Sequence, residues 1–312
     1  MNTARAVVIV SGGAAISPFT TPEAVCAEGQ PAGSTDTFLR AELLNLGYRV
    51  FTSPASIGGQ QVTNDPGFQG FAAPPPQLPA EVTVNCVGPI DDAGGSLVNF
   101  LSLLHEQYGV DEVDLIGHSM GGLFSRAAMG ILHRRGSTPV RVRSLATIGS
   151  PWQGAFLMDY AFGDLPITIS AGDSATETFM VEAEKLARAE SQGAAEQVTD
   201  AFLSGPNGWN EQQAGVLDDH EVLLIGGTAL RVEGGDPRAW PHDGIVSIAS
   251  STGSDVSSAV LPRKKVAQFN DLHSILFCDV LELPWERALT WDPAVVECLV
   301  GHLEQMGNPA AP

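Results

Sequence analysis

Short apolar runs alternate with helix-spaced apolar residues along most of this chain. Residues 6–10 form an uninterrupted apolar run, which is typical of a strand buried on both faces of a parallel sheet. Further strands are predicted at 48–51, 113–116, 142–148, 221–225 and 263–269, with a short edge strand at 82–86. Helices are predicted after the capping residues Thr35 and Asp36, from Ser96 to Gly109, from Leu123 to Arg135, and, interrupted by prolines, between 281 and 303. This alternation indicates an α/β fold.

Two stretches depart from the alternation. Residues 53–80 are polar and rich in proline, so they cannot form regular structure, and we expect this long loop near the substrate entrance. Residues 155–217 carry two amphipathic helices instead, at 174–188 and 194–203. Such an insertion is either a mobile lid or a fixed cap, and its amphipathicity does not separate the two because it predicts burial and not motion.

Composition and charge narrow the class of protein. Of the 312 residues, 44% are hydrophobic, which is enough for a sizeable core. No apolar run approaches the ~20 residues of a membrane-spanning helix, so we expect a soluble protein. Lys and Arg number 16 against 36 Asp and Glu, and the formal net charge is −20. Such a surface repels nucleic acid and anionic bilayers and suits a neutral substrate.

The four cysteines bear on the compartment. An even number permits two disulfides and an oxidising environment, and we favour Cys26–Cys86 and Cys278–Cys298 because each pair lies within one end of the chain. The alternative is four buried free thiols. Residues 3–17 are not a signal peptide, because their apolar run is short and supplies the first strand and its loop. If the protein is exported, its signal lies upstream and has been removed.

One stretch carries candidate chemistry. Gly117-His118-Ser119-Met120-Gly121-Gly122 follows a predicted strand and opens a predicted helix, which is the setting of a nucleophile elbow. The serine is held on a strained turn with its side chain exposed, and a Cβ at either flanking glycine would collide with the neighbouring strand or helix. The helix points its amino end at the place where negative charge develops during acyl transfer.

At these residues the chain resembles the α/β-hydrolase superfamily, and within it the secreted bacterial lipases and esterases whose motif reads GHS-x-GG. The resemblance implies an α/β-hydrolase fold, with a mostly parallel central sheet and helices on both faces. Residues 1–154 and 218–312 would form this core, and residues 155–217 would form an inserted helical lid or cap. Residues 149–154, Gly-Ser-Pro-Trp-Gln-Gly, are similar to a turn that such lipases place near the active site.

The resemblance also implies an oxyanion hole. In lipases the loop after the first central strand often carries His-Gly, and the next backbone N–H binds the oxyanion; here Ser11 and Gly12 replace that pair. Gly13 is then the expected donor, with Ala14 as the alternative by one position. Met120, directly after the serine, would supply the second N–H.

Asp243 and His273 complete the expected catalytic triad. Asp243 lies in an Asp-Gly-Ile-Val segment that resembles the one carrying the acid in lipases, whereas its rivals Asp236 and Asp255 lack that setting. His273 follows the last predicted strand, where the family places its histidine, and the chain order Ser, Asp, His is the one this fold requires. The remaining histidines are assigned to helical patterns (His105, His133, His302), to loop flanks (His220, His242) and to packing within the elbow (His118).

Together with the resemblance, these residues predict a serine hydrolase that cleaves carboxylic esters, namely a lipase or esterase acting on acylglycerols or similar lipid esters, in transient contact with lipid interfaces. Alternatives are an acyltransferase or polyester depolymerase using the same triad, or a non-catalytic scaffold that binds a ligand. No cofactor is needed. Some related lipases hold a structural calcium through an Asp two residues after the histidine; because Ile275 stands there, no metal is expected. The resemblance places the protein outside the cell.

Overall fold

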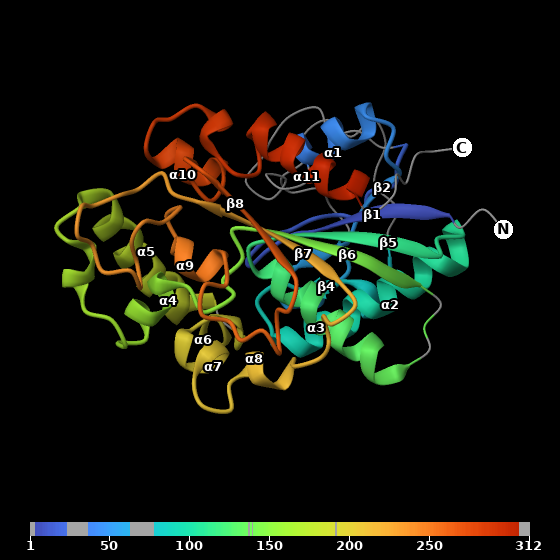
Figure 1. The fold of residues 1–312 in the computed structure, drawn as a ribbon, viewed down its shortest axis with the longest axis horizontal. Helices are drawn as coiled ribbons and strands as arrows, with labels where there is room; N and C mark the ends of the chain where they lie inside the picture. The colour runs from blue at the N-terminus through green and yellow to red at the C-terminus, as the bar shows by residue number, and fades with distance from the viewer. Residues whose placement is uncertain are drawn as a thin grey trace.

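A single parallel sheet forms the centre of the molecule. The computed structural model describes residues 4–23, 37–62, 78–136, 138, 140–190 and 192–305. Within them, six strands lie in the order β2-β1-β5-β6-β7-β8, every neighbouring pair parallel (Figure 1). The strands are β1 (Arg5–Val10), β2 (Val50–Thr52), β5 (Glu112–His118), β6 (Arg141–Ile148), β7 (Glu221–Gly227) and β8 (Lys264–Phe269). The predicted α/β class with a mostly parallel central sheet is confirmed.

Helices cover both faces of this sheet because its central strands are apolar on both. In β1, Ala6, Val8 and Val10 pack into one hydrophobic cluster, while Val7 and Ile9 pack into another on the opposite face. Helices α2 (Ile90–Tyr108) and α3 (Met120–Arg135) supply the first cluster, and α1 (Thr37–Asn45) and α11 (Pro293–Gln305) the second. Figure 1 shows the two pairs of helices on opposite sides of the sheet.

Several element boundaries differ from the prediction. Helix α2 begins at Ile90 and not at Ser96, so its first turns include Gly94. A Cβ at Gly94 would lie 2.5 Å from the Cβ of Ala127, so this glycine lets α2 and α3 approach closely and does not break the helix. The predicted edge strand at 82–86 is reduced to β4 (Val84–Asn85), which pairs with β3 (Ala55–Ser56) beside two 3₁₀ turns, Ile57–Gly59 and Ala80–Val82.

The C-terminal helix is also shorter than predicted. It begins at Pro293, and the preceding segment contains helix α10 (Ile275–Val280) and, directly after Pro284, a 3₁₀ turn, Trp285–Arg287. The two prolines thus separate elements instead of interrupting one helix. The predicted caps Thr35 and Asp36 lie outside the described residues, as does much of the predicted loop at 53–80.

The segment predicted as a lid or cap, residues 155–217, packs in two different places. Its first part contains α4 (Phe156–Ala161), a 3₁₀ turn (Ile167–Ser170) and α5 (Ser174–Glu190), and it shares a separate hydrophobic cluster with Ala239 and Trp240. Its second part contains α6 (Ala194–Gln197), α7 (Asp200–Ser204) and α8 (Trp209–Gln212), where one helix at 194–203 is predicted. Thr199 divides α6 from α7 because its hydroxyl accepts the Phe202 N–H and caps α7.

The second part of the insertion packs into the core on the face of the sheet that α2 and α3 cover. It contributes Leu203 and Trp209 to the hydrophobic cluster beneath α2 and α3. The buried guanidinium of Arg126, on α3, lies between the rings of Trp152 and Trp209, 4.1 and 4.7 Å from their centroids, and donates to Asn210 at 2.9 Å. In Figure 1 helices α4, α5 and α9 (Ile248–Ser251) lie at the end of the sheet away from the N-terminus, whereas α6, α7 and α8 lie below it.

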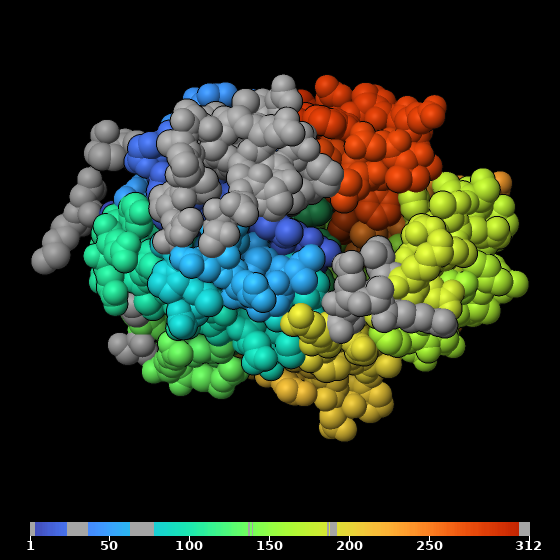
Figure 2. All heavy atoms as spheres, turned by 180° about the vertical axis from the view of Figure 1, so that it is seen from behind, coloured from blue at the N-terminus to red at the C-terminus, as the bar shows by residue number. Residues whose placement is uncertain are grey.

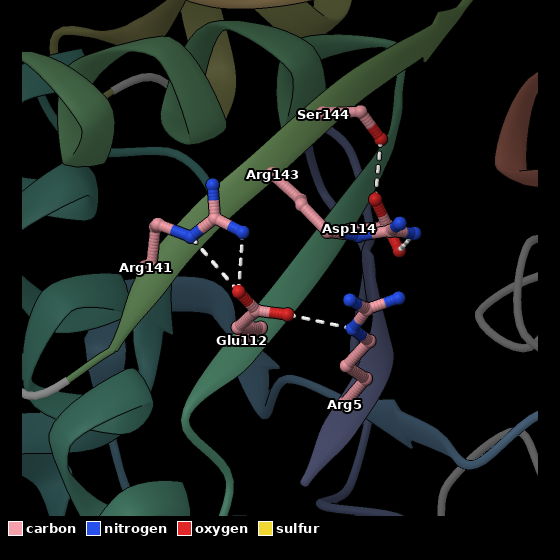
Figure 3. A network of polar contacts seen from close by, with 6 residues as sticks. All are labelled: Arg5, Glu112, Asp114, Arg141, Arg143 and Ser144. Carbon is pink, nitrogen blue, oxygen red and sulfur yellow. Dashed lines mark hydrogen bonds and ion pairs between the residues drawn. The ribbon is translucent and has the colours of Figure 1, made fainter. Parts of the chain in front are cut away.

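A polar network lies at the opposite, amino-terminal end of the central strands (Figure 3). Glu112 accepts from Arg5 at 2.6 Å and from Arg141, and buried Asp114 accepts from Arg143 and Ser144. A bulge between β5 and β6 pairs Val113 with Val142 but Asp114 with Ser144, so Arg143 is the extra residue. The network satisfies two carboxylates that would otherwise be buried without partners.

The predicted disulfides are wrong. Cys86, Cys278 and Cys298 carry free thiols, and Cys26 lies outside the described residues. Cys278 packs in a small cluster with Leu272 and Ala288, whereas Cys298 packs on the second face of the sheet, so the two belong to different parts of the core. Cys86 donates its thiol proton to the carbonyl of Ala15 at 2.9 Å, in place of bonding Cys26.

Candidate active site

Ser119 occupies the turn between β5 and α3. The strand ends at His118 and the helix begins at Met120, so a single residue reverses the chain. Ser119 has φ 55° and ψ −130°, a conformation that non-glycine residues rarely adopt and that is found at functional sites when the surroundings enforce it. Its N–H donates to the carbonyl of Ile148 on the neighbouring strand at 2.8 Å, which anchors the turn to β6.

The flanking glycines are required by close backbone contacts. A Cβ at Gly121 would lie 2.1 Å from the carbonyl oxygen of Val10, and one at Gly117 would lie 2.4 Å from the nitrogen of Gly122. No side chain fits at either position without moving β1 or α3. The collision predicted from the sequence is thus confirmed, and the elbow has the strand–turn–helix form that presents a nucleophile.

Asp243 and His273 form a buried pair at the carboxyl ends of the strands. Asp243 lies in the loop after β7, and His273 follows β8. The Nδ1 of His273 is 2.7 Å from the Oδ2 of Asp243, and the His273 backbone N–H donates to the Asp243 carbonyl, also at 2.7 Å. Their side chains are 3% and 0% exposed, so this contact is shielded from water. This contact favours the imidazole tautomer that carries its proton on Nδ1 and its lone pair on Nε2.

The other oxygen of Asp243 is held by the turn that follows it. Oδ1 accepts the N–H groups of Ile245 at 3.0 Å and Val246 at 2.8 Å. Burial alone would raise the pKa of Asp243, but the hydrogen bond and charge of His273 and these two N–H donors outweigh burial and hold its pKa below the ordinary value. The carboxylate is therefore ionised and its orientation is fixed.

His118, the residue before Ser119, contacts His273 and so places Ser119 and His273 in the same site. The His118 ring lies 4.7 Å from the His273 ring, centroid to centroid, and its Nε2 donates to the His273 carbonyl at 3.0 Å. Burial lowers the pKa of His118 to about 3, so this ring is neutral. Among the described residues the Ser119 hydroxyl makes no hydrogen bond to His273; in free enzymes such contacts are often long and tighten when substrate binds.

Two further glycines shape the space around these residues. A Cβ at Gly149 would lie 3.0 Å from both the Asp243 carboxylate and the His273 ring, so the turn at 149–154 backs the pair directly. A Cβ at Gly12 would lie 2.6 Å from the Cβ of Ser119. Figure 2 shows a hollow on this face between the red C-terminal segment and the blue N-terminal residues, with yellow-green residues of the insertion alongside.

Gly13 and Met120, the residues of the two expected oxyanion donors, are in contact. A Cβ at Gly13 would be 2.9 Å from the sulfur of Met120, which brings the loop after β1 against the start of α3. The alternative donor, Ala14, directs its N–H to the carbonyl of Cys86 at 3.4 Å. Of the two candidates, this geometry favours Gly13.

The rival acids lie elsewhere. Asp236 pairs with Arg238 at 2.7 Å on the surface, and Asp255 lines a separate cavity of about 420 Å³ beside the insertion. Of the other histidines, His105, His133 and His302 lie in α2, α3 and α11 as predicted. His242 was assigned only to a loop flank, yet it is fully buried against the rings of Phe156 and Trp240, contacts that no local pattern in the sequence indicates.

Nothing in the described part of the chain forms a group of three or more His, Cys, Asp or Glu side chains able to hold a metal ion. Within the same residues, no helix has the length and apolar character needed to cross a bilayer.

The parallel sheet and the elbow define a class, and sequence comparison agrees with it. The family model described as alpha/beta hydrolase fold matches residues 68–229, about half of the chain. The chain belongs to this family.

Named relatives are distant. A triacylglycerol lipase from Burkholderia plantarii is 27% identical over 169 residues, which cover 50% of this chain and 40% of that lipase. The chain thus matches less than half the length of this relative. The solved structure of the mature form of Bacillus licheniformis lipase BlEst2 has a TM-score of 0.51 and 13% identity, covering 89% of this chain and 88% of that one. Its propeptide form has the same TM-score at 14% identity, covering 87% of this chain and 46% of that one. At these identities, the similarity of this chain to the two BlEst2 structures shows a common fold and nothing more.

Proposed function

We propose that the protein is a serine hydrolase that cleaves carboxylic esters through an acyl-enzyme on Ser119. The observation that carries the proposal is the buried Asp243–His273 pair, set beside a nucleophile elbow at the carboxyl ends of the strands. A hydrogen-bonded acid and imidazole next to a half-buried serine in a strained backbone conformation are the parts that activate a hydroxyl for acyl transfer.

In the acylation step, the His273 Nε2 takes the proton of the Ser119 hydroxyl as Oγ bonds to the ester carbonyl carbon. The carbonyl oxygen becomes an oxyanion, which accepts the backbone N–H groups of Gly13 and Met120. When the tetrahedral intermediate collapses, His273 returns the proton to the leaving alcohol. Each oxyanion donor contributes about 3 kcal/mol of transition-state stabilisation in enzymes of this kind.

In the deacylation step, water attacks the acyl-enzyme while His273 takes its proton, and Ser119 leaves as the free hydroxyl. Asp243 holds the imidazole tautomer throughout and offsets the positive charge that forms on the ring, because it stays ionised. The neutral His118 supports the His273 backbone without adding a second positive charge.

The proposed substrates are acylglycerols or similar lipid esters. Two observations support this class: the similarity to a triacylglycerol lipase over half of the chain, and a hydrophobic cluster in the insertion that includes Phe277, one turn beyond His273. The net charge of −20 favours a neutral ester over an anionic one.

Export from the cell is proposed on the family resemblance alone, because the free thiols remove the argument from cysteines. Detection of the processed protein in culture medium tests it.

A p-nitrophenyl ester series from short to long acyl chains tests the function. Hydrolysis should be measurable in the wild type and should fall on the order of 10⁴–10⁶-fold in kcat in Ser119→Ala, with the fold intact. Activity that rises with chain length supports a lipase, and activity on short chains alone an esterase. A wild-type rate in Ser119→Ala contradicts the proposal. With no hydrolysis, labelling of Ser119 by a fluorophosphonate separates a transferase or narrow depolymerase from a non-catalytic scaffold, which would not react.

A further inference from the structure

His242, the residue before Asp243, is fully buried and held on every side. Its ring lies between the rings of Phe156 and Trp240, with centroids 4.6 and 4.5 Å away. Its backbone exchanges two hydrogen bonds with Leu230, each of 3.1 Å. An apolar ring could fill this space equally well. The two ring nitrogens of His242 are polar atoms whose burial costs free energy unless they are hydrogen-bonded.

Both ring nitrogens have partners, and the partners determine where the proton lies. The N–H of Gly244 donates to Nδ1 at 3.0 Å, so Nδ1 is an acceptor and the proton of the neutral ring is on Nε2. Burial lowers the pKa of His242 to about 4, which keeps the ring neutral at neutral pH. Nε2 then donates to the hydroxyl of Thr176, 3.2 Å away.

Thr176 belongs to the first turn of α5, in the insertion. It is 0% exposed, and its hydroxyl donates in turn to the Oδ1 of Asp173 at 2.7 Å, the same oxygen that accepts the Thr176 N–H and caps the helix. The contacts thus form a directed series from His242 through Thr176 to Asp173. It joins the amino end of α5 to the loop that carries the proposed catalytic acid.

The series acts on the turn that orients Asp243. Gly244 gives its N–H to the His242 ring, and the next two N–H groups, those of Ile245 and Val246, hold the Oδ1 of Asp243. His242 is therefore bonded to the same turn that aims the other carboxylate oxygen at His273. A shift of the His242 ring displaces this turn and with it the carboxylate.

We propose that His242 and Thr176 are positioning residues of the reaction, through which helix α5 holds Asp243 in line with His273. The inference rests on the proposed function, since it assigns these residues to the same triad. It also makes the amino end of α5 an anchor of the active site: the hydrogen bond to His242 must break before this end of the helix can move away.

Three variants on one helix test the proposal. Thr176→Val keeps the size of the side chain and removes the hydroxyl, Thr176→Ser keeps the hydroxyl, and Thr178→Val makes the same change two residues along, at an exposed hydroxyl that bonds only within the helix, to the Ser174 carbonyl. Steady-state kinetics on a short-chain p-nitrophenyl ester, scaled to the fraction of Ser119 that a fluorophosphonate titrates, give kcat and KM. Proton NMR of histidine-labelled protein reports the His273–Asp243 hydrogen bond.

Thr176→Val should lower kcat about 10- to 100-fold with KM within about twofold, as expected when a catalytic group is misplaced by a fraction of an ångström. The proton signal of the His273–Asp243 bond should shift in the same variant. Thr176→Ser and Thr178→Val should match the wild type in both measurements. If Thr176→Val does not fold, Thr176→Ala replaces it with the same expectation.

Three results would overturn the proposal. One is an unchanged kcat and an unchanged proton signal in Thr176→Val. Another is an equal loss in Thr176→Ser, which would make side-chain size the cause and not the hydroxyl. The third is an equal loss in Thr178→Val, which would show a general effect on α5. Failure of the proposed function gives a different pattern, because the wild type itself would then show no Ser119-dependent turnover.

Discussion

At the scale of single residues, the carboxylate of Asp243 shows how completely this site is satisfied. The side chain has no solvent contact, yet its two oxygens accept three hydrogen bonds, one from His273 and two from backbone N–H groups. Burial alone would raise its pKa, but the charge and hydrogen bond of His273, together with the two amide donors, hold the pKa below the ordinary value, so the negative charge persists without water. An amide side chain at this position would keep the turn but could not hold the same imidazole tautomer.

Asp243→Asn should therefore reduce kcat about 10³–10⁴-fold while leaving the unfolding temperature close to that of the wild type. The measurement is kcat on a short-chain p-nitrophenyl ester, together with thermal unfolding. Asp236→Asn is the matched control, because Asp236 makes a surface ion pair with Arg238 and should have near wild-type activity. More than a tenth of the wild-type rate in Asp243→Asn would remove this residue from the proposed triad.

At the scale of elements, the packing of α2 against α3 depends on a close approach of the two helices at Gly94. Gly94 faces Ala127 of α3, whereas its neighbour Gly95 has open space where a Cβ would stand. The two adjacent glycines therefore have different reasons to be tolerated in a helix. Gly94 permits the contact between the helices, and Gly95 only weakens α2 through its backbone entropy.

Alanine at these two positions should have opposite effects on stability. Gly94→Ala should lower the free energy of unfolding by about 1–3 kcal/mol, because the added methyl overpacks the α2–α3 contact. Gly95→Ala should raise it by up to about 1 kcal/mol, because alanine is the better helix former. Urea denaturation of both variants measures the difference. Equal effects of the two changes would mean that α2 does not approach α3 through Gly94.

The ion pairs at the amino end of β5 make stability depend on pH. Burial alone would raise the pKa of Glu112, but hydrogen bonds from Arg141 and Arg5 outweigh burial and hold its pKa below the ordinary value. A lowered pKa means that Glu112 stabilises the fold above its unfolded-state pKa of roughly 4.3, and that this contribution is lost as the pH falls through the folded-state value.

Glu112→Gln should accordingly lower the free energy of unfolding at pH 7 by roughly 1 kcal/mol, a discounted figure because Arg141 is 65% exposed. The difference from the wild type should shrink as the pH drops from about 5 toward 3. Chemical denaturation across this pH range provides the measurement, with Glu297→Gln on the exposed face of α11 as the control. A difference that stays constant with pH would exclude the ionised Glu112 as its source.

At the scale of the whole molecule, hydrophobic packing and not covalent cross-linking holds the described parts together. Four hydrophobic clusters contain most of the buried apolar side chains, and the insertion takes part in two of them. Three cysteines are distributed among these clusters as free thiols. Burial raises the pKa of both Cys86 and Cys278 to about 12, so neither is reactive in the folded state.

Alkylation of the denatured, unreduced protein should thus modify at least the three described cysteines, Cys86, Cys278 and Cys298. Labelling of the native protein should be slow at Cys86 and Cys278, because the thiolate is scarce and buried. Mass spectrometry counts the labels, and thermal unfolding with and without reductant should give the same midpoint. Fewer than three labels on the denatured protein would restore a disulfide.

Much of this protein is determined by neighbouring residues and is therefore open to prediction from its sequence. The central strands follow from continuous apolar runs, and the elbow follows from Gly117, Ser119 and Gly121, because backbone sterics act over a few consecutive positions. Asp243 and His273 were found through a motif resemblance and their order in the chain. The structure brings these two side chains to 2.7 Å although they are 30 residues apart.

Only the tertiary structure decided what depends on distant contacts. Gly94 is accommodated within α2 because Ala127 of α3 packs closely against it. Cys278 and Cys298 do not pair because they lie in different hydrophobic clusters. The bond between Thr176 and His242 joins residues 66 positions apart, and neither residue stands in a motif. Such contacts depend on how distant elements pack against each other, so no local sequence pattern predicts them. Strand periodicity and turn sterics depend on consecutive residues and can therefore be predicted from the sequence.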